Sequence, residues 1–133
     1  MKKMISDNPF HVSIGAALIM IGMFLMKQDS YFRWPPEIAV LANDDVVGFL
    51  LMLFGIGYLY WVFDPEKTAK LNHFLLSGSA GLMTLLTVYQ LLHFLIVGAD
   101  MPFISNGCIT AIIMILAARS DSRDHDDSNR HAG

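Results

Sequence analysis

Three polar side chains stand close together inside a long apolar stretch, and their types could support chemistry. They are Tyr89, Gln90 and His93. Successive residues of an α-helix are rotated by about 100°, which places all three within about 100° of one another on one face. Three roles are open to such a face: hydrogen bonding to a neighbouring helix, lining a water-filled path, and ligating a metal or haem. Interhelical hydrogen bonding is favoured because polar side chains commonly join apolar helices in this way.

The positions of the other histidines argue against a shared metal site. His73 lies one long helical stretch before His93, and their separation in sequence corresponds to about 30 Å along one helix. His11 is expected at the opposite membrane face. The sequence also lacks HExxH, CxxC and Ser-His-Asp arrangements and contains a single cysteine, Cys108, which we expect to be buried as a small apolar residue. We therefore expect no catalytic residue, no metal, no cofactor and no enzymatic activity.

The elements that position these residues are four stretches without Asp, Glu, Lys or Arg. They cover residues 10–26, 46–63, 71–97 and 102–118. Hydrophobic residues make up 54% of the 133 residues and charged residues 16%, whereas a soluble domain has about 25% charged residues. Each stretch approaches or exceeds the roughly 17–25 apolar residues that cross a bilayer as a helix. The sequence therefore predicts an all-α, integral membrane four-helix bundle within residues 1–118.

Residues that favour helix starts precede each apolar stretch. They are Asp7 or Asn8 before Pro9, Asn43 or Asp44, Asp64 before Pro65, and Asp100 before Pro102. Side chains of Asp and Asn cap helix N-termini, and proline is tolerated at the first helical position because its missing N–H would be unpaired there. With helix starts at these residues, the second, third and fourth helices are expected to be joined by tight antiparallel turns.

Small residues recur at helical spacing in three of the four stretches. The candidate packing residues are Gly15 and Gly22, Gly48 and Gly55, and Ser77, Gly81 and Thr84. Each glycine pair is separated by seven residues, or about two helical turns, so each pair lies on one face. Small residues let helix backbones approach closely in lipid. Packing within one monomer and packing between monomers both remain open.

The distribution of basic residues predicts the orientation. Seven of the nine Lys and Arg residues lie at the two termini and in the second loop, and two lie in the first loop. The positive-inside rule therefore places both termini in the cytoplasm, with the protein in the cytoplasmic (inner) membrane. Residues 119–133 combine three Arg with four Asp and have no large apolar residue. This composition predicts a disordered, charged tail.

The absence of charged residues from the four apolar stretches argues against one class of function, ion-coupled transport. Ion-coupled transporters usually carry an ionisable residue inside the membrane, and none of the four stretches has an Asp, Glu, Lys or Arg. The net charge of −3 gives no indication of nucleic-acid binding. We expect a non-enzymatic protein whose partners are the lipid bilayer, further copies of itself as a homo-oligomer, or another membrane protein. Alternatives are an accessory or anchor subunit of a larger membrane complex, and a small transporter or channel for a neutral solute.

The whole architecture resembles that of phage holins and holin-like proteins. The resemblance is carried by the four apolar stretches, the tight connections and the charged segment 119–133. It implies accumulation in the inner membrane, oligomerisation and opening of lesions that release or activate an endolysin. The segment 119–133 is slightly acidic, whereas the tails of that family are often basic, and many holins have fewer spans.

Overall fold

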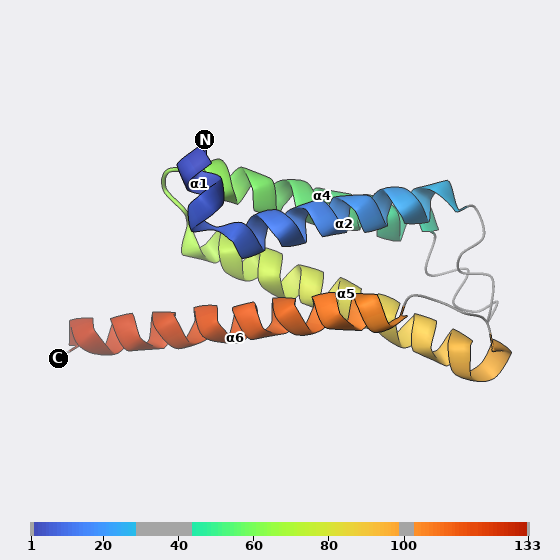
Figure 1. Cartoon of the computed structure of the whole chain (residues 1–133). Helices are drawn as coiled ribbons and strands as arrows, with labels where there is room; N and C mark the ends of the chain where they lie inside the picture. The colour runs from blue at the N-terminus through green and yellow to red at the C-terminus, as the bar shows by residue number, and fades with distance from the viewer. Residues whose placement is uncertain (1, 29–43, 99–102, 133) are drawn as a thin grey trace. The chain divides into compact units, whose positions relative to one another are not determined.

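The computed structural model describes residues 2–28, 44–98 and 103–132, and these residues form helices joined by short turns. The helices are α1 (Lys2–Asp7), α2 (Pro9–Lys27), α4 (Asp44–Phe63), α5 (Ala69–Val97) and α6 (Phe103–Ala132) (Figure 1). The described residues contain no strand. The prediction of an all-α fold is therefore confirmed.

Four of these helices are long and apolar enough to cross a membrane. The candidate spans are Pro9–Lys27, Asp45–Phe63, Ala69–Val97 and Phe103–Ser120. Large apolar side chains are exposed on all four helices, among them Phe24, Phe49, Leu95 and Ile115. Exposed apolar surface on every helix is expected when the surrounding solvent is lipid and not water. These features indicate a multi-pass membrane protein.

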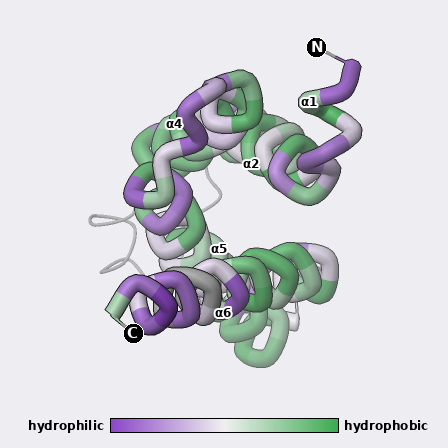
Figure 2. The backbone as a smooth tube through the Cα atoms, turned by 90° about the vertical axis from the view of Figure 1, so that its left-hand side faces the viewer, coloured by the Kyte–Doolittle hydropathy of each residue, from purple (hydrophilic) through white to green (hydrophobic). Residues whose placement is uncertain are grey.

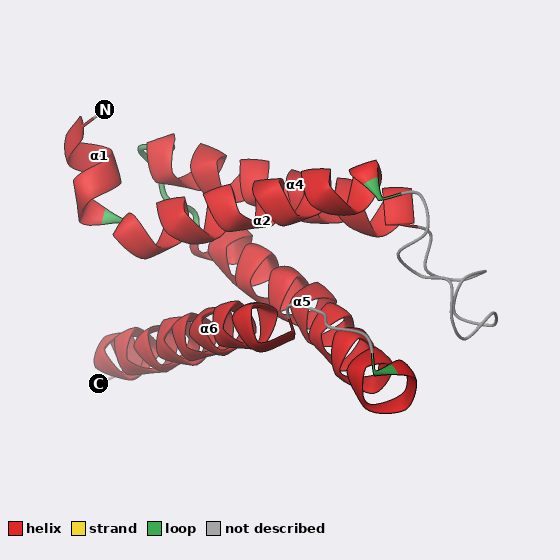
Figure 3. Ribbon diagram, turned by 45° about the vertical axis from the view of Figure 1, so that its right-hand side comes forward, coloured by secondary structure: helices red, strands yellow, loops and turns green. Residues whose placement is uncertain are grey.

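The chain divides into two compact units, Met1–Thr68 and Ala69–Gly133. In the first unit, α2 and α4 pack against each other as an antiparallel pair (Figure 3). Their buried residues include Leu18, Leu25, Leu51 and Val62. In the second unit, α5 and α6 form another antiparallel pair. The architecture therefore consists of two helix pairs.

The start of α5 differs from the prediction. Pro65 was expected to begin this helix, but α5 begins at Ala69. The Asp64 side chain accepts a hydrogen bond from the backbone N–H of Glu66 at 3.1 Å, which forms a local turn in place of a helical cap. Lys67 then has a positive φ of 41°, which a right-handed helix cannot contain.

The other predicted helix starts have mixed outcomes. Asn8 occupies the cap position of α2 with Pro9 following, but its side chain makes no capping hydrogen bond. Its amide nitrogen donates instead to the carbonyl of Met4 at 3.1 Å. The preceding residues form α1, a helix that the sequence had not indicated. The expected caps at Asn43 and Asp100 lie outside the described residues.

The C-terminal segment is the clearest correction. Residues 119–133 were predicted to be disordered, but α6 continues without a break to Ala132. In Figure 2 this end of α6 is coloured as hydrophilic, in contrast to the apolar part before it. Starting a helix is costly but extending one is cheap, and the apolar part of α6 supplies the start. Asp126 stands four residues before Arg130, an order that stabilises a helix, and Arg130 and His131 complement the negative end of the helix dipole.

Candidate functional site: a polar seam between α5 and α6

Hydrogen-bonding side chains from α5 and α6 meet inside the second unit. Thr87 and Gln90 come from α5, and Asn106 and Thr110 come from α6. The Asn106 amide nitrogen donates to the Gln90 side-chain oxygen at 2.9 Å. The Thr87 and Thr110 hydroxyl oxygens lie 3.2 Å apart, within hydrogen-bond distance. We call these four residues the polar seam.

Helical spacing explains why the seam forms. Thr87 and Gln90 are three residues apart on α5, and Asn106 and Thr110 are four residues apart on α6, so each pair lies on one helix face. Both hydroxyls also lie 2.7 Å from a carbonyl of their own helix, Thr87 from that of Met83 and Thr110 from that of Asn106. Each hydroxyl has one proton, so when one threonine donates across the seam the other donates within its own helix. Bonds to the preceding turn of the same helix are a common way for Thr hydroxyl groups to be satisfied inside helices.

Two further contacts extend the pairing along the helices. The Asn72 amide nitrogen donates to the Ser120 hydroxyl at 3.2 Å near the N-terminal end of α5. The rings of Phe94 and Phe103 lie 5.1 Å apart near its C-terminal end. Because the seam lies between these contacts, α5 and α6 are paired over most of the length of α5.

Three of the four seam residues are buried, Thr87 is half-buried, and the seam carries no formal charge. Gln90 is 1% exposed, and Asn106 and Thr110 are each 6% exposed. Amide and hydroxyl groups do not ionise near neutral pH, so the seam contains no titratable group. Within residues 2–28, 44–98 and 103–132, no three His, Cys, Asp or Glu side chains are placed to hold a metal ion. The chemistry available to the seam is hydrogen bonding, either between its own members or to water.

The three residues of the expected polar face have different environments. Gln90 belongs to the seam through its bond to Asn106. Tyr89 is 5% exposed, and its ring lies 5.7 Å from that of His93. The His93 Nδ1 atom is buried without a hydrogen-bond partner among the described residues. The structure thus brings Tyr89 and His93 together and joins Gln90 to α6 by a hydrogen bond.

Four glycines, two in α2 and two in α4, bring the two backbones into close approach. A Cβ atom built on Gly55 would lie 2.6 Å from the carbonyl oxygen of Gly15, and one built on Gly15 would lie 3.0 Å from that of Gly55. Gly22 and Gly48 face each other in the same reciprocal way, with a Cβ on Gly48 at 2.7 Å from the Gly22 oxygen. We call these four residues the glycine contact. It lies within one chain.

The small residues of α5 behave differently. Ser77 and Gly81 are exposed, and a Cβ atom built on Gly81 would have no neighbouring atom within 4 Å. The Thr84 hydroxyl donates to the carbonyl of Ala80 at 2.7 Å in its own helix. We call these three residues the α5 small-residue face. Gly81 makes no close approach to another described helix, so packing of this face between monomers stays a prediction.

Sequence reasoning missed most of the seam. Asn106, Thr110 and Thr87 were not singled out, although Asn106 is the only Asn in the fourth apolar stretch and stands four residues before Thr110. That spacing could have indicated a polar face on α6 to match the one on α5. Cys108 was expected to be buried, but it is exposed. It stands between Asn106 and Thr110, on the part of α6 turned away from the seam.

Comparison with known proteins found no family model, no curated protein and no solved structure that matches this chain.

Proposed function

We propose that this protein is a non-enzymatic, multi-pass membrane protein that self-associates through the α5 small-residue face and permeabilises the cytoplasmic membrane in the manner of holins. The proposed orientation has both termini in the cytoplasm. The observation that carries the proposal is the contrast between the two sets of small residues. The glycine contact is occupied within the chain, whereas Gly81 is open to close approach by another helix.

The polar seam supplies a way in which a water-filled path could form between α5 and α6. The hydrogen bonds between α5 and α6 are uncharged, and interhelical bonds of this kind contribute only about 0.6–2 kcal/mol each. Association through the other side of α5 would allow the seam to exchange its internal bonds for water, with Gln90 and Asn106 then lining a path. No ionisable group inside the four spans is needed for such a leak.

The test compares two substitutions at the same position. Gly81→Leu places a bulky side chain on the face that is proposed to meet another monomer, whereas Gly81→Ala keeps it small. We expect Gly81→Leu to reduce cross-linked oligomers in the membrane and to delay the loss of membrane potential on timed expression, and Gly81→Ala to retain both. A membrane-potential dye reports the second quantity.

Two results would contradict the proposal in different ways. Unchanged cross-linking of Gly81→Leu would mean that this face does not join monomers. Oligomers that accumulate while the membrane potential holds would mean that the assembly does not permeabilise the membrane.

An accessory or anchor subunit is the second candidate function, and α6 favours it. The helix continues past the last apolar residues into an exposed segment that ends at Ala132. Such a segment offers a regular surface to a partner outside the membrane. Removal of residues 121–133 separates the two candidates: loss of co-purification with a partner supports the anchor, whereas a change only in the timing of permeabilisation supports the holin-like function.

A further inference from the structure

An aromatic cluster closes one end of the α2–α4 pair. The imidazole of His11 stacks on the Trp61 indole with ring centroids 4.6 Å apart, and the ring of Tyr58 lies 5.8 Å from that imidazole. The Trp61 side chain is 8% exposed. Its Nε1 atom donates to the carbonyl oxygen of Thr68 at 3.1 Å. This hydrogen bond holds the segment after α4 against the cluster.

Lys67 is held over this cluster in a strained conformation. Its Nζ atom lies 5.5 Å from the centroid of the Trp61 ring, within the range of a cation–π interaction. Its φ of 41° lies in the left-handed region, which costs a residue other than glycine about 1–2 kcal/mol. The turn formed by Asp64 and the bond from Trp61 to Thr68 hold this conformation. A lysine kept where glycine would be free of strain points to a role for its ammonium group.

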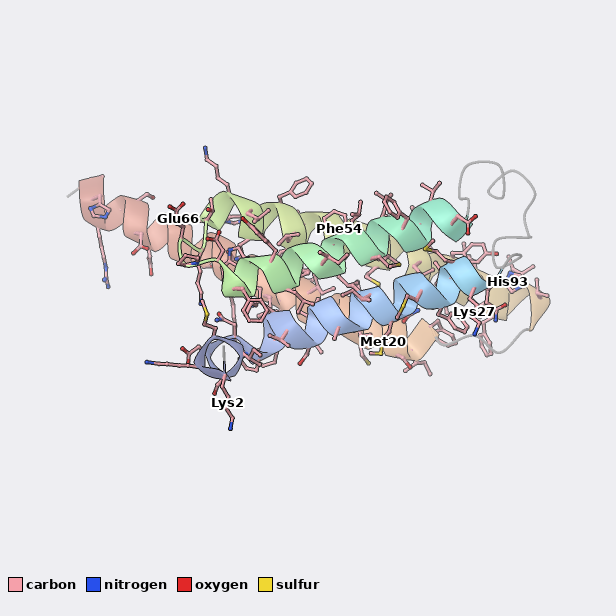
Figure 4. The ribbon with its side chains drawn as sticks, turned by 90° about the horizontal axis from the view of Figure 1, so that it is seen from above. Lys2, Met20, Lys27, Phe54, Glu66 and His93 are labelled. Carbon is pink, nitrogen blue, oxygen red and sulfur yellow. The ribbon has the colours of Figure 1, made fainter. Side chains whose placement is uncertain are left out.

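Basic and acidic side chains are balanced in number at this end of the pair. Helix α1 contacts both α2 and α4 and carries Lys2, Lys3 and Asp7. The segment after α4 adds two carboxylates and Lys67. Figure 4 shows Lys2 and Glu66 at this end of the pair, with Lys27 at the other. Among the described residues, Lys2, Lys3 and Lys67 take part in no ion pair, so their ammonium groups are available to a ligand.

A ligand at this position must satisfy both signs of charge. Asp64 and Glu66 stand beside Lys67 in the sequence, and Asp64 uses one carboxylate oxygen in its own turn. A purely anionic headgroup would be attracted by the lysine but repelled by these carboxylates. A headgroup with a phosphate and a primary ammonium matches both, because lysine donates to phosphate oxygens and carboxylates accept from ammonium N–H groups.

We propose that this end of the first unit binds a zwitterionic phospholipid headgroup of the phosphatidylethanolamine type. Lys67 contacts the phosphate, Asp64 and Glu66 contact the ammonium, and the buried Trp61 ring supports Lys67 from beneath at the membrane interface. The site rests on the proposed membrane location, since α4 ends at Phe63 and the following residues would then lie among the headgroups. Tryptophan commonly occupies that level of a bilayer.

Fluorescence quenching of Trp61 tests the proposal in the full-length protein. With Trp34→Phe as background, Trp61 is the only tryptophan. The protein is placed in nanodiscs that contain one brominated lipid in turn: phosphatidylethanolamine, phosphatidylcholine or phosphatidylglycerol. We expect phosphatidylethanolamine to be enriched about two- to fivefold at Trp61, the range given by one or two exposed charge contacts. Phosphatidylcholine lacks ammonium N–H donors, and phosphatidylglycerol lacks the cation.

Variants at the two ends of the helix pair provide matched controls. Lys67→Gln and Glu66→Gln should each reduce the enrichment, whereas Lys27→Gln and Asp45→Asn make the same charge changes at the opposite end and should not. Lys67→Gly relieves the backbone strain, so we expect it to raise the thermal stability while it abolishes the enrichment. The stability measurement shows whether a lost enrichment reflects misfolding.

Each remaining outcome contradicts a definite part of the proposal. Equal quenching by the three lipids would show that Trp61 lies at the membrane but selects no headgroup. Stronger quenching by phosphatidylglycerol would show that net negative charge is recognised instead. Absence of quenching by any lipid would contradict the interfacial position, and therefore the proposed membrane topology as well. Relief of quenching by soluble glycerophosphoethanolamine would show that the site takes a free headgroup and not a membrane lipid.

Discussion

At the scale of single residues, the pair formed by Gln90 and Asn106 shows how a membrane helix tolerates an amide. Each side chain is almost fully buried, and the Asn106 amide donates to the Gln90 oxygen at 2.9 Å. The net gain from one such bond is small, but an amide left without a partner in an apolar environment costs about 1–3 kcal/mol. The pair therefore stabilises the unit mainly because the Gln90 oxygen gives the buried Asn106 amide a hydrogen-bond partner.

This asymmetry leads to a prediction for leucine substitutions. Gln90→Leu leaves the Asn106 amide unpaired, so we expect a loss of about 1–2 kcal/mol in the free energy of unfolding. Asn106→Leu should have a similar effect. The double variant should recover part of the loss because neither amide then remains. Unfolding of the detergent-solubilised protein in a double-mutant cycle measures the coupling between the two positions.

Thr84→Val is a suitable control, since the Thr84 hydroxyl bonds only within its own helix. A double variant that is less stable than both single variants, with losses that simply add, would argue against a direct bond between the amides.

The candidate site was only partly predictable at this scale. Helical phase placed Tyr89, Gln90 and His93 on one face of α5, but phase within one helix does not identify the partner on another. That Gln90 meets Asn106 depends on the register of α5 against α6. Register follows from packing along the whole helix pair, which a short sequence pattern does not contain.

At the scale of elements, the glycine contact determines how α2 and α4 pair. Gly15 faces Gly55 and Gly22 faces Gly48, and each carbonyl oxygen lies close to the opposite glycine. Contacts of Cα–H groups with carbonyl oxygens recur where helices come this close. Because the pairs are seven residues apart on both helices, a shift in register would place a larger side chain against a backbone.

Alanine substitutions should distinguish glycines that contact another helix from glycines that do not. Alanine in place of glycine stabilises a helix by roughly 0.5–1 kcal/mol. At Gly22 the new methyl group would meet the carbonyl oxygen of Gly48, and overpacking typically costs about 1–3 kcal/mol. We therefore expect Gly22→Ala to lower the stability and Gly81→Ala, which meets no atom, to leave it unchanged or raise it. Thermal unfolding in detergent provides the comparison, and equal effects at the two positions would contradict the observed contact.

The elements themselves were largely predictable because the absence of charge marks the apolar helices directly. Their ends were less so. The Asp64–Pro65 pair resembles a helix start, but the Asp64 side chain forms a turn with Glu66 instead. Composition also led to the wrong prediction of a disordered tail. A polar segment such as 119–132, which would be unfolded alone, can extend a helix that already exists.

At the scale of the whole molecule, the described residues contain four candidate spans, which is an even number. If all four cross the membrane, both termini must lie on the same side. The excess of Lys and Arg at the termini and in the second loop predicts that this side is the cytoplasm. The placement of the two units relative to each other cannot be inferred from such rules, since charge counts fix sides and not contacts.

Cysteine labelling can test this topology. In a Cys108→Ser background, cysteines at Ser6 and Ser128 should both resist a membrane-impermeant maleimide added to intact cells and react after the cells are opened. Both positions are exposed in the structure, so burial in the protein does not prevent their labelling. Labelling of only one position in intact cells would mean an odd number of spans, and labelling of both would reverse the orientation.

The unbroken course of α6 has a mechanical consequence. One rigid helix joins the seam residue Asn106 to the charged end at Ala132, so both turn about the same axis. A rotation large enough to carry Asn106 away from Gln90 would turn the charged surface by the same angle. The segment beyond Ser120 extends about 18 Å at 1.5 Å per residue, and even a modest tilt of the span would sweep its tip sideways by several ångströms. A rotation or tilt of α6 against α5 inside the membrane would thus move the charged end of α6 on the aqueous side, because no turn or loop interrupts the helix.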